Sequence, residues 1–246
     1  MMASDTFGYD RAITIFAPDG RLYQVEYANE AVRRGTPAIG VKSKEGVILV
    51  VQKKATSKLE DISYLHKIFK VDEHVGVAIS GLHADGRRLV DYARLVAQWN
   101  RLTYDEKISI KSLTKTICDL EQYYTQHAFA RPFGVALLIA GFDDTGPQLY
   151  STGASGSYWG WKATSIGSGS ENAQEYLQKN YKKDLTLEEA WILGFKALEA
   201  ATKETLTVET VEAAQIDAKT KMFRELTQDE IKKYLKQIQK EKESEE

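Results

Sequence analysis

The stretch Val135-Ala136-Leu137-Leu138-Ile139-Ala140 is the longest apolar run in the chain, and it decides which fold we expect. Successive side chains of a strand point to opposite faces of a sheet, so a strand without polar residues is covered on both faces. The run is much shorter than the roughly 20 residues that cross a bilayer. It therefore predicts a sheet that packs against a second sheet on one face and against helices on the other.

Outward from this run, strands and helices follow one another in blocks. Runs of β-branched residues bounded by turn residues predict strands at residues 38–41, 46–51, 68–71, 75–80, 133–141, 148–151, 158–159, 162–166, 211–216 and 221–224. Apolar residues at helical spacing predict helices around residues 89–100, 113–124, 170–179, 187–202 and from Thr227 onward. Helix pairs between strand blocks argue against a parallel sheet with single crossover helices. We expect one α+β domain, residues 1–246, folded as a four-layer αββα sandwich: two stacked, mainly antiparallel sheets flanked by helix pairs.

The two ends of the chain add to this pattern. An extra N-terminal helix is expected over residues 21–34, between the turn at Pro18-Asp19-Gly20 and Gly35. Its apolar positions are Leu22, Val25, Ala28 and Val32. Residues 1–8 are small and polar, as in segments that change order instead of packing into a core. Residues 240–246 are almost all charged, and we expect a solvated, fraying end there.

Composition narrows the partners and the compartment. The 33 Lys and Arg residues nearly balance the 35 Asp and Glu residues, so nucleic acid is not an expected partner. Cys118 is the only cysteine, which excludes an internal disulfide and fits a reducing compartment. The first residues lack the basic start and apolar run of a signal peptide. We expect a cytoplasmic protein with no membrane partner.

Few residues have the spacing of a known catalytic or metal-binding motif. The four histidines are His66, His74, His83 and His127. None has a second His, Cys or carboxylate at metal-binding spacing, so we expect no metal and no cofactor. Gly167-Ser168-Gly169-Ser170 lacks the lysine of a phosphate-binding loop, and we expect a tight turn into a helix with Ser170 as the N-cap. One enzymatic hypothesis remains, a threonine hydrolase in which the α-amine of an N-terminal threonine activates its own hydroxyl. Thr36 is the candidate.

The N-terminal region carries a family resemblance. The segment Tyr9-Asp10-Arg11-Ala12-Ile13-Thr14-Ile15-Phe16-Ala17-Pro18-Asp19-Gly20-Arg21-Leu22-Tyr23-Gln24-Val25-Glu26-Tyr27-Ala28 resembles the signature of proteasome α subunits. Shorter segments, including Ser80-Gly81-Leu82 and Arg131-Pro132-Phe133-Gly134-Val135, extend the likeness over nearly the whole chain. It implies the αββα sandwich of the N-terminal nucleophile hydrolases. It also implies a heptameric outer ring on the proteolytic rings of a 20S core particle, of archaeal type or eukaryotic-like.

Proteasome β subunits share this fold and are threonine proteases, so individual residues must distinguish the two classes. Laid on the β pattern, Thr36 stands where the catalytic threonine begins its strand, but it follows a helix and keeps a peptide nitrogen. Gln52 stands where the β pattern has an acidic partner, and an amide cannot take up the proton. Of these catalytic residues of the β pattern, only the lysine is present in this chain, as Lys67. The resemblance therefore implies a subunit without catalytic residues.

Two roles are open for Lys67. From the residues alone, a lysine at the edge of a strand is most simply one that extends into solvent. In the α subunits that the chain resembles, the matching lysine lines a pocket between neighbouring subunits that receives the C-terminal tail of a regulatory ATPase or activator. The resemblance puts Gly35, Leu22 and Leu82 in the same pocket, where they would offer close backbone approach and apolar walls.

The resemblance also implies a gate and a pore. Tyr9, Asp10, Pro18 and Tyr27 match the cluster that holds the N-terminal tails open, with residues 1–8 as the gate. Without the motif, a tyrosine on an amphipathic helix is more simply a packing residue.

The loop His127-Ala128-Phe129-Ala130-Arg131 stands where related subunits line the pore, although theirs is often richer in glycine. The simpler interpretation of Phe129 is an anchor buried within its own loop. The alternative is an apolar ring at the entry that grips unfolded chains.

We expect a structural and gating subunit that performs no chemistry. Its partners would be other α subunits, β subunits, a regulatory ATPase or activator, and unfolded polypeptide substrates, in the cytoplasm and also in the nucleus if the source is eukaryotic. Two other classes remain as alternatives, an autonomous amidohydrolase built on Thr36 and a monomeric binding module. The sequence leaves open whether the ring contains one kind of α subunit or several.

Overall fold

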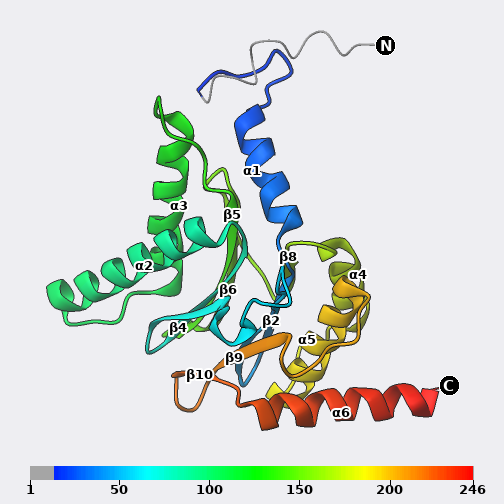
Figure 1. Cartoon of the computed structure of the whole chain (residues 1–246). Coiled ribbons are helices and arrows are strands. Elements are labelled where there is room, and N and C mark those ends of the chain that lie inside the picture. Colours follow the sequence, from blue (N-terminus) through cyan, green and yellow to red (C-terminus); the bar gives the residue numbers. More distant parts are fainter. Residues whose placement is uncertain (1–13, 246) are drawn as a thin grey trace, which may run out of the picture.

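The computed structural model describes residues 14–245 as two stacked antiparallel sheets between helical layers (Figure 1). The first sheet has the strand order β10-β9-β2-β1-β8, with β1 (Ala38–Ser43), β2 (Gly46–Gln52), β8 (Ala163–Ile166), β9 (Val211–Asp217) and β10 (Phe223–Glu225). The second has the order β3-β4-β5-β6-β7, with β3 (Ile68–Asp72), β4 (Val75–Gly81), β5 (Val135–Asp143), β6 (Gly146–Thr152) and β7 (Tyr158–Gly160). The predicted αββα sandwich is confirmed.

Helices cover the outer faces of both sheets (Figure 1). The second sheet is covered by α2 (His83–Tyr104) and α3 (Ile110–Gln126). The first is covered by α4 (Ser170–Asn180), α5 (Leu187–Thr202) and α6 (Gln228–Glu245). The extra N-terminal helix is α1 (Tyr23–Arg34), and a short 3-10 turn, Ile62–Tyr64, precedes β3. Within residues 14–245, no helix combines the length and the apolar character that a membrane span needs.

The strand β5 is buried on both faces, as its sequence predicts. Val135, Leu137 and Ile139 pack in the cluster beneath α2 and α3. Leu138 and Ala140 point the other way, into the cluster between the two sheets. Burying one such aliphatic side chain contributes about 1.5–3 kcal/mol, so this strand joins two layers of the core.

Two expectations about helix ends are wrong. Ser170 is not an N-cap, because that position belongs to Gly169, whose φ of 64° leaves Ser170 as the first helical residue. A Cβ on Gly169 would lie 2.1 Å from the carbonyl oxygen of Ala201, so glycine is required by contact as well as by φ. The charged C-terminus does not fray at Lys240. The helix continues to Glu245, and Lys196 on α5 binds the carboxylate of Glu241 at 2.7 Å.

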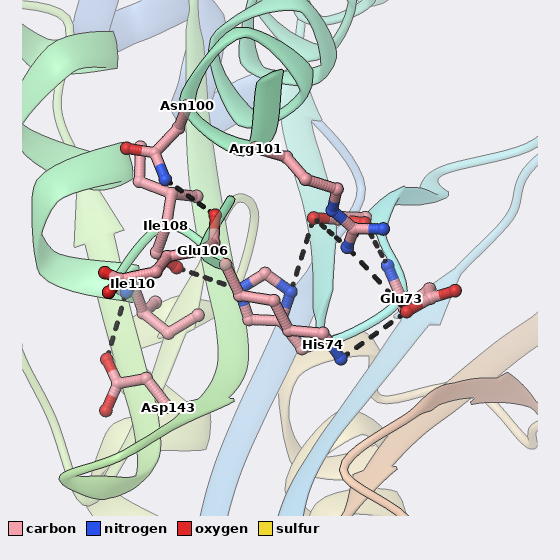
Figure 2. A network of polar contacts seen from close by, with 10 residues as sticks. Glu73, His74, Asn100, Arg101, Glu106, Ile108, Ile110 and Asp143 are labelled. Atoms are coloured by element: carbon pink, nitrogen blue, oxygen red, sulfur yellow. Dashed lines mark hydrogen bonds and ion pairs between the residues drawn. The ribbon is translucent and has the colours of Figure 1, made fainter. Parts of the chain in front are cut away.

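A polar network holds the β3–β4 turn against the C-terminal end of α2 (Figure 2). Arg101 donates hydrogen bonds to both carboxylate oxygens of Asp72, at 2.9 and 3.1 Å, and lies 3.7 Å from the carboxylate of Glu73. His74 is buried, and its Nε2 lies 2.8 Å from the carbonyl oxygen of Ile108. Hydrogen bonds between charged groups are stronger than those between neutral groups. The network therefore fixes where α2 ends and α3 begins.

Glu121 is an ionisable group inside the α3 layer. Its side chain is fully buried, and one carboxyl oxygen accepts a hydrogen bond from the Thr152 hydroxyl on β6 at 3.2 Å. Burial raises the pKa of Glu121 to about 8, against hydrogen bonds from Cys118 and Thr152 that lower it. The folded chain therefore holds a proton on this carboxyl at neutral pH, whereas the unfolded chain does not.

We expect Glu121→Gln to remove a pH dependence of stability. Because the pKa is raised on folding, the stabilisation is complete below the unfolded pKa and is lost as pH rises toward 8. The variant should gain stability over the wild type by at most about 1.4 kcal/mol per pH unit in that window. Thermal unfolding at pH 5, 7 and 9 measures this, with exposed Glu171→Gln as the control. If stability depends on pH in the same way in Glu121→Gln and in the wild type, the raised pKa of Glu121 would be contradicted.

Candidate functional site

Three backbone segments meet where α1 ends. A Cβ on Gly35 would lie 2.3 Å from the amide nitrogen of Gly81, and one on Gly81 would lie 2.3 Å from the carbonyl oxygen of Gly134. Gly81 also has a φ of +118°, which side chains rarely adopt. The amide of Ser168, just after β8, donates to the carbonyl of Gly35 at 2.8 Å. The end of α1 is therefore fixed to both sheets.

Thr36, the residue after this junction, is bound to Lys67 and Gln52. The ammonium nitrogen of Lys67 lies 2.7 Å from the carbonyl oxygen of Thr36 and 2.6 Å from its hydroxyl oxygen. The Thr36 hydroxyl donates its own proton to the carbonyl of Gln52 at 2.8 Å. The amide of Gln52 turns away and donates to Glu204 at 3.1 Å. The structure thus brings together the three residues compared with the β-subunit pattern, but without a carboxylate beside the lysine amine.

Lys67 is buried, with 3% of its surface exposed, so the expectation that it extends into solvent is wrong. Burial lowers its pKa to about 7, and the charge of Glu212 opposes that shift. Glu212 instead accepts a hydrogen bond from the Lys67 backbone amide at 2.8 Å. Burial raises the pKa of Glu212, while this hydrogen bond lowers it. Lys67 therefore acts first as an internal link between β3 and the start of β1.

A surface hollow of about 560 Å³ lies beside the C-terminal end of α1, and we call it the α1 hollow. Its lining residues are Tyr27, Glu30, Ala31, Arg34, Gly35, Gly81 and Leu82. Gly35 and Leu82 thus line one hollow, whereas Lys67, which the resemblance puts in the same pocket, is buried and is not among the lining residues. Leu22 lies at the opposite end of α1, about 18 Å along a 12-residue helix, so one chain does not bring it to Gly35.

Of the expected gate cluster, Tyr9 and Asp10 lie outside the described residues, as does the gate segment 1–8. Pro18 is exposed in a turn closed by the bond from the Gly20 amide to the Ala17 carbonyl, at 2.8 Å. Tyr27 is half exposed on α1 and stacks on Tyr23, with ring centroids 6.5 Å apart. Tyr27 contributes to the α1 hollow instead of packing into the core.

The loop after α3 presents an exposed aromatic ring. Phe129 has a φ of 65° and is fully exposed, so its burial as a local anchor is wrong. His127 stacks on Tyr123 with ring centroids 3.5 Å apart, and its Nδ1 lies 2.7 Å from the Tyr123 carbonyl oxygen. Ala128 and Ala130, on either side of Phe129, have small side chains. The loop base is ordered by contacts, while Phe129 projects away from the chain.

Arg131 anchors the end of this loop. Its guanidinium donates to both carboxylate oxygens of Asp85, at the start of α2, at 2.6 and 2.8 Å. The backbone amide of Gly134 donates to the same carboxylate at 2.9 Å. Burial raises the pKa of Asp85, but these bonds outweigh it and leave the pKa below its usual value. A charged, bidentate pair therefore sets the direction in which the loop enters β5.

Sequence reasoning missed Arg34, Glu212 and Asp85. A signal existed for Arg34, a cation in the last turn of a helix that ends at an expected pocket glycine. Asp85 lies in the short segment Ala84-Asp85 that also resembles the family, but no role was assigned to it. Glu212 carried no signal, because its partner Lys67 lies far away in the sequence. Among residues 14–245, no group of three or more His, Cys, Asp or Glu side chains could hold a metal ion.

An αββα sandwich with a threonine and a lysine amine paired at the start of a strand defines the fold class of the N-terminal nucleophile hydrolases. Residues 32–216 match the family model of the proteasome subunit, and residues 9–31 match the model of the N-terminal signature of A-type proteasome subunits. The proteasome α subunit of Methanothermobacter thermautotrophicus is 51% identical, over 100% of both chains. The one from Saccharolobus islandicus is 50% identical over 94% of this chain and 97% of its own length. The chain therefore belongs to the proteasome α-subunit family.

We expect Lys67→Met to alter the stability of the fold above neutral pH. A buried amine with a folded pKa near 7 stays protonated to higher pH in the unfolded chain, so wild-type stability rises with pH above 7. Lys67→Met should lack this rise, and it should also lose the link to Thr36. Calorimetric melting at pH 6.5, 8 and 9.5 measures both, with exposed Lys219→Met as the matched control. If the melting temperatures of the wild type and of Lys67→Met change in parallel over the three pH values, the lowered pKa of Lys67 would be refuted.

Proposed function

We propose that this chain is a non-catalytic α subunit of a 20S proteasome core. The observation that carries this is the continuous run of α1 through Gly35 into β1, which keeps the nitrogen of Thr36 in a peptide bond. The threonine mechanism needs a free amine as base, and the Lys67 amine donates its hydrogen bonds to Thr36 and to the Gln52 carbonyl, with no carboxylate among these partners. The fold thus retains the frame of a hydrolase while its nucleophile is blocked.

In this proposal seven α subunits form the outer ring, which stacks on β subunits and admits unfolded polypeptide to their chamber. The fully exposed Phe129 supports a role at the entry, because a large apolar ring projecting from an anchored loop suits transient contact with unfolded chains. Residues 1–8 would gate the same entry. The single cysteine, Cys118, is a buried thiol, which suits the cytoplasmic location that we propose.

We further propose that the α1 hollow receives the C-terminal tail of a regulatory ATPase or activator. Leu82, Ala31 and Tyr27 give it apolar walls, and exposed Arg34 offers a cation to a terminal carboxylate. Lys67 lies beneath the floor and holds the Thr36 peptide next to Gly35. Leu22 of the same chain is too far away to line the hollow, which supports a pocket completed by a neighbouring subunit.

The catalytic alternative has a direct test. The isolated chain should not hydrolyse fluorogenic peptides, and Thr36→Ala should not change peptide turnover by particles assembled with β subunits. Thr36→Ser, which keeps the hydroxyl bonded to Lys67 and Gln52, controls for a structural effect. Turnover by the chain alone that disappears in Thr36→Ala would overturn the proposal.

The tail site predicts a specific loss of stimulation. Leu82→Asp should leave the ring intact but abolish stimulation of peptide entry by a partner with a C-terminal tail, because a second carboxylate in the lining, in addition to Glu30, would repel the incoming carboxylate and replace an apolar wall. Leu82→Met keeps the apolar wall and should retain stimulation. Arg34→Ala should weaken it, whereas Arg88→Ala, an exposed arginine on α2 that does not line the hollow, should not. Full stimulation of the Leu82→Asp ring would refute this docking site.

A further inference from the structure

One carboxylate oxygen joins two segments at the N-terminal end of α2. The Oδ2 atom of Asp85 accepts a hydrogen bond from the Arg131 guanidinium at 2.6 Å and another from the Gly134 amide at 2.9 Å. Arg131 ends the loop that carries Phe129. Gly134 directly precedes β5, a strand that contacts both α1 and α3 (Figure 1). A change in the position of Gly134 therefore changes the geometry at the oxygen that anchors the loop.

Gly134 packs directly behind two walls of the α1 hollow. Its carbonyl oxygen accepts a hydrogen bond from the Leu82 amide at 2.8 Å. A Cβ on Gly134 would lie 2.9 Å from Cδ1 of Leu82 and 3.3 Å from Cβ of Ala31, so no free space separates the glycine from these two lining residues. Close-packed groups transmit a displacement instead of absorbing it. A group that enters the hollow and displaces Leu82 or Ala31 therefore displaces Gly134 as well.

The loop at the other end of this contact has an uncommon backbone conformation. Phe129 has a φ of 65°, in the left-handed region that bulky residues rarely adopt. Such a conformation persists only where neighbouring contacts impose it. The contacts lie at the two ends of the loop, where His127 is bound to the Tyr123 carbonyl and Arg131 to Asp85. Release of one end lets Phe129 return to a common backbone conformation.

The Asp85–Arg131 pair is the end that opens at little cost to the core. The Arg131 side chain is 62% exposed, whereas the Asp85 side chain is 10% exposed. An ion pair with an exposed partner contributes little to stability, because water solvates the released group. After Arg131 leaves, Asp85 keeps the Gly134 amide and the favourable field at the N-terminal end of α2, so its charge is not left without a partner. The interior thus supports two arrangements of the loop.

We propose that Asp85 is a positioning residue that couples the α1 hollow to the loop that carries Phe129. A side chain seated against Leu82 displaces Gly134, the Oδ2 atom of Asp85 follows the Gly134 amide, and the bond to Arg131 opens. Phe129 then leaves its left-handed conformation. This inference rests on the proposed docking of a tail in the hollow, and it states how occupancy there changes the entry. Because coupling between two sites is reciprocal, release of the loop also changes the affinity of the hollow.

A static role for Asp85 is the alternative. The pair would then hold the loop in one place whether the hollow is empty or filled. The second guanidinium nitrogen of Arg131 binds the Oδ1 atom of Asp85 at 2.8 Å, so the Gly134 amide shares only one of the two oxygens. That shared oxygen favours coupling, because a shift of the amide acts on one of the two bonds to Arg131 and breaks the bidentate geometry on which the strength of the pair depends.

Fluorine NMR at position 129 tests the coupling. In the full-length chain with Ala31→Cys, Phe129 is replaced by 4-fluorophenylalanine, and benzyl methanethiosulfonate attaches a benzyl group inside the hollow. The native Cys118 is buried, so the introduced cysteine is the one that reacts. We expect the fluorine resonance to shift on modification. The same reagent on Lys232→Cys, at an exposed position of α6, is the control and should leave the resonance in place.

Two further variants separate coupling from a static role. Asp85→Asn keeps an oxygen for the Gly134 amide but lacks the charge that holds the guanidinium, and Arg131→Gln removes the pair from its exposed side. In both, the fluorine resonance should already lie where the benzyl group moves it, and modification of Ala31→Cys should no longer shift it. A benzyl-induced shift of full size in either variant, or no shift with the pair intact, would overturn the proposal.

The fluorine measurement does not depend on the proposed partner, because the benzyl group fills the hollow without one. If position 129 responds while Leu82→Asp particles are still fully stimulated by a tailed partner, the coupling stands and the docking site is refuted. If Leu82→Asp abolishes stimulation while position 129 does not respond to the benzyl group, the docking site stands and the coupling is refuted.

Discussion

The close meeting of three backbones at Gly35, Gly81 and Gly134 is the constraint on which the rest of the site depends. Each added Cβ would lie within 3 Å of a neighbour: Gly35 and Gly81 against backbone, and Gly134 against the side chain of Leu82. The contact fixes the end of α1, and therefore the position of Thr36, relative to both sheets. Because α1 cannot move away without breaking this packing, the start of β1 stays covered. The same contact forms the floor of the α1 hollow.

The buried Lys67 amine depends on that junction. Its oxygen partners are the Thr36 carbonyl, the Thr36 hydroxyl and the Gln52 carbonyl, the last at 3.3 Å. A hydrolase would direct such an amine at a reacting hydroxyl. Here the hydroxyl is itself bound to the Gln52 carbonyl, and the nitrogen of Thr36 belongs to a peptide bond. The amine therefore stabilises the connection between α1, β2 and β3.

The function that we propose depends instead on surfaces that this rigid interior positions. The Asp85–Arg131 pair directs the loop that carries Phe129, and α1 carries Tyr27 and Arg34 to the edge of the hollow. Both are arranged around the helices and strand ends that the core fixes, so the proposed function needs no free amine on Thr36.

The sequence by itself determined the layers, because the apolar run of β5 has to be buried on both faces whatever surrounds it. It also determined that the nitrogen of Thr36 lies in a peptide bond with Gly35 and that Gln52 carries an amide in place of a carboxylate, since these are matters of covalent structure. Only the tertiary structure decided that Lys67 is buried, that Phe129 is exposed, and that Leu22 lies far from Gly35. It also decided that Gly169 replaces Ser170 as the cap. Burial depends on which distant segments meet, as with Lys67 and Glu212, and no local spacing encodes that contact.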